Sequence, residues 1–154
     1  CGQATYEGEP AIELEAAAWR ALAGEIASST DSLAGASTPA DGSPILDSQP
    51  LFEALLSGID AGAPADKLAL GFHIAIARAS ARIASEICAR EGINTVALSG
   101  GVFMNRLLLR LLTRELKDAG LAALVPHTVP VNDGCIAYGQ AAIARARLAQ
   151  TAPQ

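Results

Sequence analysis

The sequence predicts a mainly helical α/β fold with a few parallel strands, and two observations support this. Hydrophobic residues make up 51% of the 154 residues, with much alanine, whereas aromatic residues are only 4%. This composition favours helices that pack closely through small side chains. The second half reads as strand, helix, strand and helix, which is the order typical of parallel α/β architecture. The length is sufficient for one domain with a sizeable core.

A first helix is expected from Glu9 to Gly24, because acidic residues and Pro10 suit a first helical turn and glycine ends helices. The segment 27–44, "ASSTDSLAGASTPADGSP", has the composition of a flexible loop. Taken by themselves, the glutamates of this region indicate only an acidic helix start. They are Glu7, Glu9, Glu13 and Glu15.

Two more helices complete the first half. The short apolar segment 45–47 is expected to form a strand, and Ser48 is placed to cap a helix that begins near Pro50. The longest helix is predicted from Pro64 to about Arg90, because apolar residues recur at spacings of three and four over its whole length.

The second half alternates strands and helices. Residues 94–98 are short, apolar and partly β-branched, as expected of a buried strand, and 121–125 are a second candidate. A helix is expected over 102–119 between them, and a last helix over 132–149. The tail, 151–154, is expected to be disordered.

Charge and composition exclude several classes of protein. The net charge is −5, with no basic stripe, so nothing predicts binding to nucleic acid. No apolar run reaches the roughly 18 residues that a membrane helix needs, and no signal peptide is recognisable. Cys1, Cys88 and Cys135 are too widely spaced for a disulfide framework, which favours a cytoplasmic location. A start at Cys1 instead of Met suggests a piece of a longer chain.

Ser99-Gly100-Gly101, between a predicted strand and a predicted helix, is a candidate phosphate-binding turn. Such a turn leaves backbone N–H groups unpaired, and the absence of side chains lets a ligand approach. Asn105 follows within one turn and can aim its amide at the same ligand. The alternative is a tight strand–helix corner without a ligand. The stretch matches neither a P-loop nor a dinucleotide-binding fingerprint.

Asp133 opens the last predicted helix, where its carboxylate is either a helix cap or a metal ligand. If the two strands are parallel, Asp133 and the glycine turn both lie beyond their carboxyl ends, where α/β sheets bind ligands. Asp133 alone cannot complete a metal site, so further ligands are expected outside this chain. His73 is expected to be a packed, hydrogen-bonded histidine, and His127 a solvated one.

Three motifs resemble those of the HypF family, the carbamoyltransferases of nickel-iron hydrogenase maturation. "VALSGGVFMNRLLL" and "VPVNDGCIAYGQAA" are similar to the end of that family's sequence, and "TYEGEPAIELEA" is similar to its Y-E-G-Q-A-A-x-x-L-E segment. The last domain of the family resembles TsaD of the sugar kinase, Hsp70 and actin superfamily. The resemblance implies that 1–150 is the C-terminal part of a TsaD-like domain, within a ribonuclease H-like or actin-like ATPase lobe.

The resemblance implies a carbamoyltransferase that uses ATP and a divalent metal (iron, zinc or magnesium). Carbamoyl phosphate and ATP would give a carbamoyl-adenylate, and the carbamoyl group would pass to the C-terminal cysteine of the partner HypE, where it is the precursor of cyanide ligands. Neither nucleic acid nor a membrane is an expected partner. Two alternatives stay open: a TsaD-like tRNA threonylcarbamoyladenosine protein, and a non-catalytic nucleotide-binding or docking module.

The resemblance also assigns roles to residues. It implies a phosphate turn at Ser99, Gly100 and Gly101, a nucleotide contact at Asn105, a ribose contact at Glu13, a glycine segment at Gly8 and a metal ligand at Asp133. Two positions depart from the family pattern: Glu9-Pro10 stands where the family has Gln-Ala, and Cys135 where it has a second glycine. Because the family's HxxxH motif and earlier domains are absent, the isolated chain is expected to be inactive.

Overall fold

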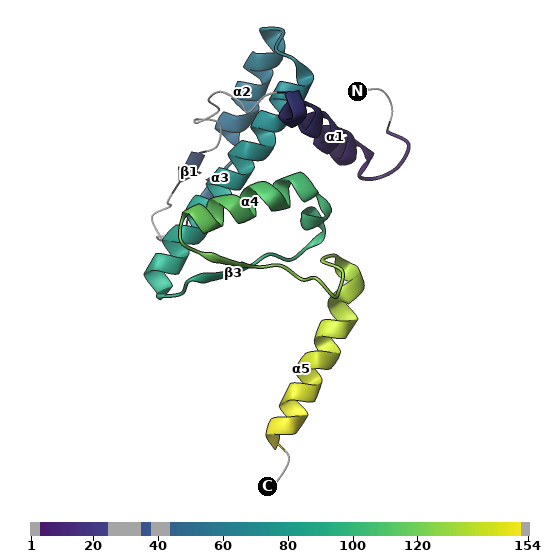
Figure 1. Ribbon diagram of the computed structural model, residues 1–154, viewed down its shortest axis with the longest axis vertical. Coiled ribbons are helices and arrows are strands. Elements are labelled where there is room, and N and C mark those ends of the chain that lie inside the picture. The colour runs from purple at the N-terminus through teal and green to yellow at the C-terminus, as the bar shows by residue number, and fades with distance from the viewer. Residues whose placement is uncertain (1–3, 25–34, 38–43, 152–154) are drawn as a thin grey trace.

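The computed structural model describes residues 4–24, 35–37 and 44–151, and their elements follow one another as Figure 1 shows. In chain order they are α1 (Glu9–Gly24), β1 (Gly35–Ser37), β2 (Ile45–Asp47), α2 (Gln49–Asp60), α3 (Ala65–Glu91), β3 (Thr95–Ala97), the 3-10 helix η1 (Gly101–Met104), α4 (Arg106–Asp118), β4 (Ala122–Leu124), the 3-10 helix η2 (Asp133–Cys135) and α5 (Ile136–Thr151). The chain is therefore mainly helical, as predicted.

Helix α3 is the centre of the molecule, and α1 and α4 pack against it (Figure 1). Alanine is the most frequent buried residue of α3, and its small side chain lets neighbouring helices approach closely. Two clusters of buried side chains result. One joins α1, α3 and α4 through Ala18, Ala69, Leu70 and Leu107. The other joins α3, α4 and the strand region through Ala77, Ala81, Leu98, Leu108, Leu112 and Leu116.

Strands β3 and β4 pair in parallel, with Val96 opposite Ala123, and α4 makes the crossover between them. This confirms the predicted parallel arrangement, which follows because strands joined through a helix return in the same direction. The side chains of Val96 and Ala123 pack against the second of these clusters, the one that contains Leu108, Leu112 and Leu116. The residues on either side of them in both strands are exposed, so only one face of this sheet is covered.

Strand β1 corrects the expectation of a continuous loop over 27–44. Its three residues, Gly-Ala-Ser, pair antiparallel with β2, which was predicted as a strand. Composition alone could not reveal β1, because a strand of small residues is recognisable only from its partner. The remainder of the predicted flexible loop, apart from Pro44, lies outside the described residues, as does the predicted disordered tail except Thr151.

The start of α2 also differs from its prediction. Ser48 occupies the cap position, but its side chain makes no capping hydrogen bond. The N–H of Gln49 instead donates to the Asp47 carboxylate, at 3.0 Å. The predicted end of α3 is confirmed, because Gly92 there adopts a left-handed conformation with φ of 68°.

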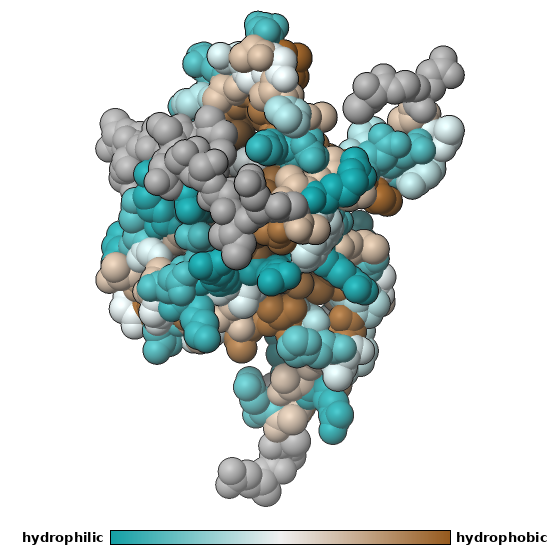
Figure 2. All heavy atoms as spheres, turned by 45° about the horizontal axis from the view of Figure 1, so that its top comes forward, coloured by the Kyte–Doolittle hydropathy of each residue, from teal (hydrophilic) through white to brown (hydrophobic). Residues whose placement is uncertain are grey.

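Helix α5 extends away from the helical core (Figure 1). Its large apolar side chains are exposed, among them Tyr138 at 67%, Ile143 at 57% and Leu148 at 71%. In Figure 2, hydrophobic side chains also gather at the centre of one face, with hydrophilic ones around them. Within the described part of the chain, no helix is long and apolar enough to cross a membrane.

Candidate functional site

The glycine turn and the loop before α5 lie side by side at the carboxyl end of the small sheet. Residues Ser99–Gly101 follow β3 almost directly, and the N–H of Gly100 donates to the carbonyl of Val131 at 2.7 Å. The amide of Asn132 reaches Met104 of η1, with 3.6 Å between Nδ2 and Sδ. The two regions that were predicted to share a crevice are therefore neighbours.

The two glycines of the turn differ in what the fold requires of them. Gly100 has φ of 109° and ψ of 156°, a conformation that only glycine adopts readily. Gly101 does not have a positive φ, and a Cβ there would meet only Asn132 Cβ, at 4.0 Å. Gly100 is therefore explained by the corner itself. Gly101 is not, and its bare backbone leaves open space beside the turn.

Asn105 is the N-cap of α4 and has protein partners for both ends of its amide. Its Oδ1 accepts a hydrogen bond from the N–H of Leu108 at 2.8 Å, and its Nδ2 lies 2.9 Å from Nε2 of His73. Only one N–H of the amide nitrogen is left for a ligand. The structure thus gives Asn105 a structural role that the sequence did not reveal, beside the predicted contact to a nucleotide.

His73 is the buried, hydrogen-bonded histidine that was predicted, with 2% of its surface exposed. Its Nδ1 lies 2.8 Å from the carbonyl oxygen of Ala69. A carbonyl can only accept, so Nδ1 carries the proton and Nε2 accepts from Asn105. These partners fit the neutral ring.

Glu15 is a partly buried residue whose hydrogen bonds the sequence interpretation missed. Its Oε1 accepts from the N–H of Leu107 at 3.1 Å and from Nε1 of Trp19 at 3.2 Å. The Arg110 guanidinium lies over the Trp19 ring, 5.7 Å from its centroid. Glu15 is the last residue of the segment "YEGEPAIELE", and this was the one available signal.

Glu13, predicted to contact ribose, is exposed and lies elsewhere on α1. Two residues of a helix are separated by about 200° around its axis, so Glu13 and Glu15 point to different sides. Glu13 lines a shallow hollow of α1 together with Arg20 and Ala65 of α3. The structure thus brings Glu15, and not Glu13, to the start of α4.

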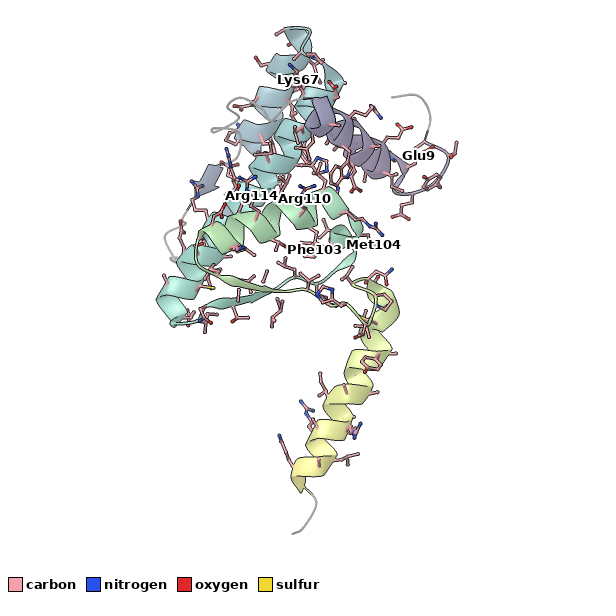
Figure 3. All side chains as sticks on the ribbon, in the orientation of Figure 1. Glu9, Lys67, Phe103, Met104, Arg110 and Arg114 are labelled. Atoms are coloured by element: carbon pink, nitrogen blue, oxygen red, sulfur yellow. The ribbon has the colours of Figure 1, made fainter. Side chains whose placement is uncertain are left out.

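Gly8 lies in the turn that leads into α1, and its φ of 90° suits glycine. Its carbonyl accepts hydrogen bonds from the N–H groups of Ala11 and Ile12, both at 3.1 Å. The Glu9 carboxylate turns back and accepts from the N–H and the hydroxyl of Thr5. These hydrogen bonds, led by that from the Thr5 N–H, hold the pKa of Glu9 below its usual value. Glu9, labelled in Figure 3, thus orders this turn.

Asp133 is exposed and is the first residue of η2, but it is not the cap. Asn132 has that role, because its Oδ1 accepts from the N–H of Gly134 at 3.1 Å. The cap interpretation of Asp133 was therefore wrong by one residue. The described residues contain no cluster of three or more metal-ligating side chains, so Asp133 has no complete set of metal ligands among them. His127 is exposed, as predicted, and Cys135 is partly buried.

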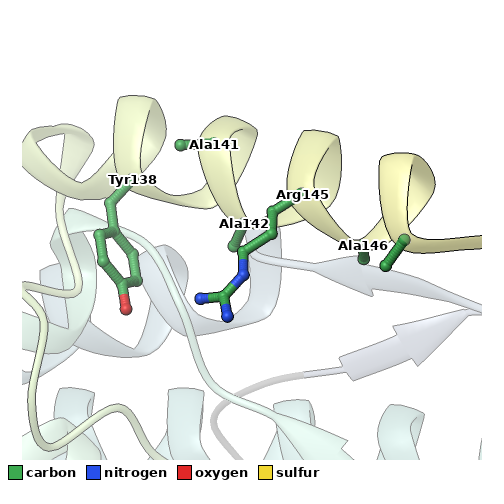
Figure 4. A pocket seen from close by; sticks show the side chains of 6 residues that line it. Tyr138, Ala141, Ala142, Arg145 and Ala146 are labelled. Carbon is green, nitrogen blue, oxygen red and sulfur yellow. The ribbon is translucent and has the colours of Figure 1, made fainter. Parts of the chain in front are cut away.

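A second hollow lies along α5, away from the glycine turn. Tyr138 and Arg145 border it, and their side chains point to the same side of the helix (Figure 4). The rest of its lining is alanine, namely Ala141, Ala142, Ala146 and Ala149. It is one face of a single helix and not an enclosed cavity.

The fold and the turn together define a class, that of α/β proteins with a glycine turn at the carboxyl end of parallel strands. The profile of the family described as "Carbamoyltransferase, Kae1-like Domain, second subdomain" matches residues 1–140. The chain therefore belongs to the HypF carbamoyltransferase family.

Relatives and solved structures agree with this assignment. The chain is 38% identical to carbamoyltransferase HypF of Rhizobium leguminosarum bv. viciae, over 91% of this chain and 17% of that relative. It is 40% identical to a HypF homologue of Cupriavidus necator, over 71% of this chain and 29% of that relative. A structure of full-length HypF in a phosphate- and nucleotide-bound form matches with a TM-score of 0.80 and 30% identity, over 96% of this chain and 18% of that one. The chain thus spans less than a third of these proteins.

Proposed function

We propose that this chain forms the nucleotide-binding part of a carbamoyltransferase that acts in hydrogenase maturation. In this proposal, carbamoyl phosphate and ATP give a carbamoyl-adenylate, and the carbamoyl group is transferred to the C-terminal cysteine of HypE in the cytoplasm. Membership of the HypF family supports the reaction class. The open space at Gly101 is the observation in this chain that carries the nucleotide site.

The turn would bind phosphate oxygens through its backbone. Gly101 and Val102 open η1, so no preceding carbonyl of that helix pairs with their N–H groups. No side chain at Gly101 stands between these groups and a phosphate. Gly100 would hold the turn in shape, because its N–H is already bonded to Val131 and its conformation fixes the corner.

The divalent metal belongs to the same proposal, with Asp133 as one ligand. The metal would neutralise charge on the nucleotide phosphates when bound. Asp133 is suited to this because it is exposed and Asn132 performs the capping beside it. Since the described residues supply no further cluster of ligands, the other ligands would come from outside them.

The proposed activity is that of a longer enzyme, because this chain spans only 17% of the length of its Rhizobium leguminosarum relative. The isolated chain is expected to give no carbamoyl transfer, since groups that act as a unit lose activity together. The exposed face of the β3–β4 sheet and the exposed side chains of α5 fit this proposal, because parallel sheets are usually covered on both faces.

Substitution of Gly101 tests the nucleotide site. Gly101→Val should fold, because the space is open, but should lower ATP affinity in the complete enzyme by at least about tenfold, or 1.4 kcal/mol. Calorimetric titration with ATP measures the affinity, and thermal unfolding measures the fold. Ala89→Val, at an exposed position near the far end of α3, adds a similar apolar bulk and should change neither. Unchanged ATP affinity in Gly101→Val would favour a corner without a ligand.

A further inference from the structure

Two side chains from other helices hold the amino end of α4. Glu15 of α1 accepts from the N–H of Leu107 at 3.1 Å. His73 of α3 lies 2.9 Å from the Asn105 amide, which accepts in turn from the N–H of Leu108. The start of one helix is therefore fixed by hydrogen bonds to both of its neighbours.

These bonds satisfy groups that a helix leaves unpaired. The first four N–H groups of an α-helix have no partner within it. At α4, the N–H of Asn105 donates to Val102, that of Leu107 to Glu15 and that of Leu108 to the Asn105 side chain. A carboxylate at this position also interacts favourably with the positive end of the helix dipole. The Glu15 carboxylate therefore occupies the amino end of α4, a position where a bound anion would otherwise be favoured.

Apolar packing alone would not fix the helix so closely. The four leucines that α4 buries hold it against α3, but such contacts have little directional preference. Hydrogen bonds weaken steeply when their angles or lengths change. The hydrogen bonds that Glu15 and Asn105 accept therefore fix the position of α4 along its axis and its rotation about that axis.

We propose that Glu15 and His73 are positioning residues of the nucleotide site, an inference that rests on the proposed function. The glycine turn is joined to α4 by η1, which has only four residues. Any shift at the start of α4 is therefore passed to Gly101. Since Glu15 belongs to α1, it also fixes the turn relative to the glycine segment around Gly8. Neither residue needs to touch the ligand.

The test measures ATP affinity in the complete enzyme for a graded pair of variants. Glu15→Ala removes both hydrogen bonds, and it should weaken ATP binding by about tenfold or more, because misplacement of about 1 Å can reduce function by up to about a hundredfold. Glu15→Gln keeps an oxygen that can accept from Leu107 and Trp19, so its affinity should stay within about threefold of the parent. His73→Leu, which removes the acceptor for Asn105 at similar volume, should behave like Glu15→Ala.

Leu116→Ala is the matched control for a loss of stability. Leu116 is fully buried near the carboxyl end of α4, so its truncation destabilises the same helix far from the turn. It should lower the melting temperature and leave ATP affinity unchanged. Equal weakening by Leu116→Ala and Glu15→Ala would overturn the positioning role, and so would unchanged affinity in Glu15→Ala. If the parent enzyme itself does not bind ATP, the proposed function fails, and the positioning role falls with it.

Discussion

Gly100 and Gly101 are neighbouring glycines with different backbone conformations, so their substitution should have different effects on stability. Gly100→Ala should lower the free energy of unfolding by about 1–3 kcal/mol, because its backbone lies in a region that is essentially restricted to glycine. Gly101→Ala should change it by less than about 0.5 kcal/mol, as is usual where no special feature is disturbed. Urea unfolding of the two variants measures the difference. Equal losses would mean that Gly101 also serves the corner.

Asp133 can be separated from its neighbour by one substitution. Asn132 is the cap of η2, so Asp133→Asn should leave the melting temperature of the complete enzyme almost unchanged. The same change removes a charged oxygen that a divalent metal prefers. Metal content and carbamoyl transfer should therefore fall by about tenfold or more, or roughly 1.4 kcal/mol. Atomic emission measures the metal content, and the carbamoyl-transfer assay measures the activity. An Asp133→Asn variant that keeps both would refute the role of Asp133 as a metal ligand.

Glu9 gives the turn before α1 a defined response to acid. Its pKa is lowered in the folded state, so the hydrogen bonds to Thr5 contribute stability above the usual pKa of 4.5. That contribution is lost as the pH falls through the lowered pKa. The Thr5 amide resonance should therefore titrate below pH 4.5 in the NMR spectrum, and Glu9→Gln should abolish this titration. A Thr5 shift that persists in Glu9→Gln would assign the effect to another group.

At the scale of elements, Asn105 makes two of the side-chain hydrogen bonds at the amino end of α4. Asn105→Ala removes the cap to Leu108 and leaves His73 Nε2 without its donor, so it should lower the free energy of unfolding by about 1–3 kcal/mol. Asn105→Asp keeps the capping oxygen and should recover part of that loss. Urea unfolding of the parent, Asn105→Ala and Asn105→Asp measures the loss of unfolding free energy and its partial recovery. A variant with alanine as stable as the parent would show that the cap contributes nothing.

Elements with strong periodicity could be predicted from the sequence, and those that depend on a partner could not. The apolar residues at spacings of three and four, with Gly92 after them, predicted the limits of α3 to within one residue of the observed Ala65 and Glu91. Strand β1 has only small residues, and its pairing with β2 is its one defining feature. The cap of η2 was misplaced because Asn132 and Asp133 are both good capping residues and only coordinates distinguish them.

The candidate site shows the same limit. The turn and Asp133 were predicted to share one edge of the sheet, and the bond between Gly100 and Val131 confirms that their loops are neighbours. The role of Glu15 could not be predicted, because its partner Leu107 lies 92 residues further along the chain. A hydrogen bond between distant segments leaves no local pattern in a single sequence.

For the whole molecule, α5 is the element least supported by the rest of the described chain. Residues 140–150 are all exposed, and most of the stability of a helix in a protein comes from packing of its apolar face against other elements. In the isolated chain, the amides of α5 should therefore exchange with solvent much faster than those of α3. Hydrogen exchange followed by mass spectrometry measures this, with α3 as the internal reference. Equal protection of both helices would show that α5 has found a partner surface.

The hydrogen bond between Gly100 and Val131 has a thermodynamic consequence. It joins the turn proposed for nucleotide to the loop that carries Asp133, so a ligand that orders one loop changes the free energy of ordering the other. If metal and nucleotide bind as proposed, the factor by which ATP raises the affinity for metal must equal the factor by which metal raises the affinity for ATP. Two titrations, each repeated with the other ligand saturating, would reveal this cooperativity as one coupling free energy shared by both sites.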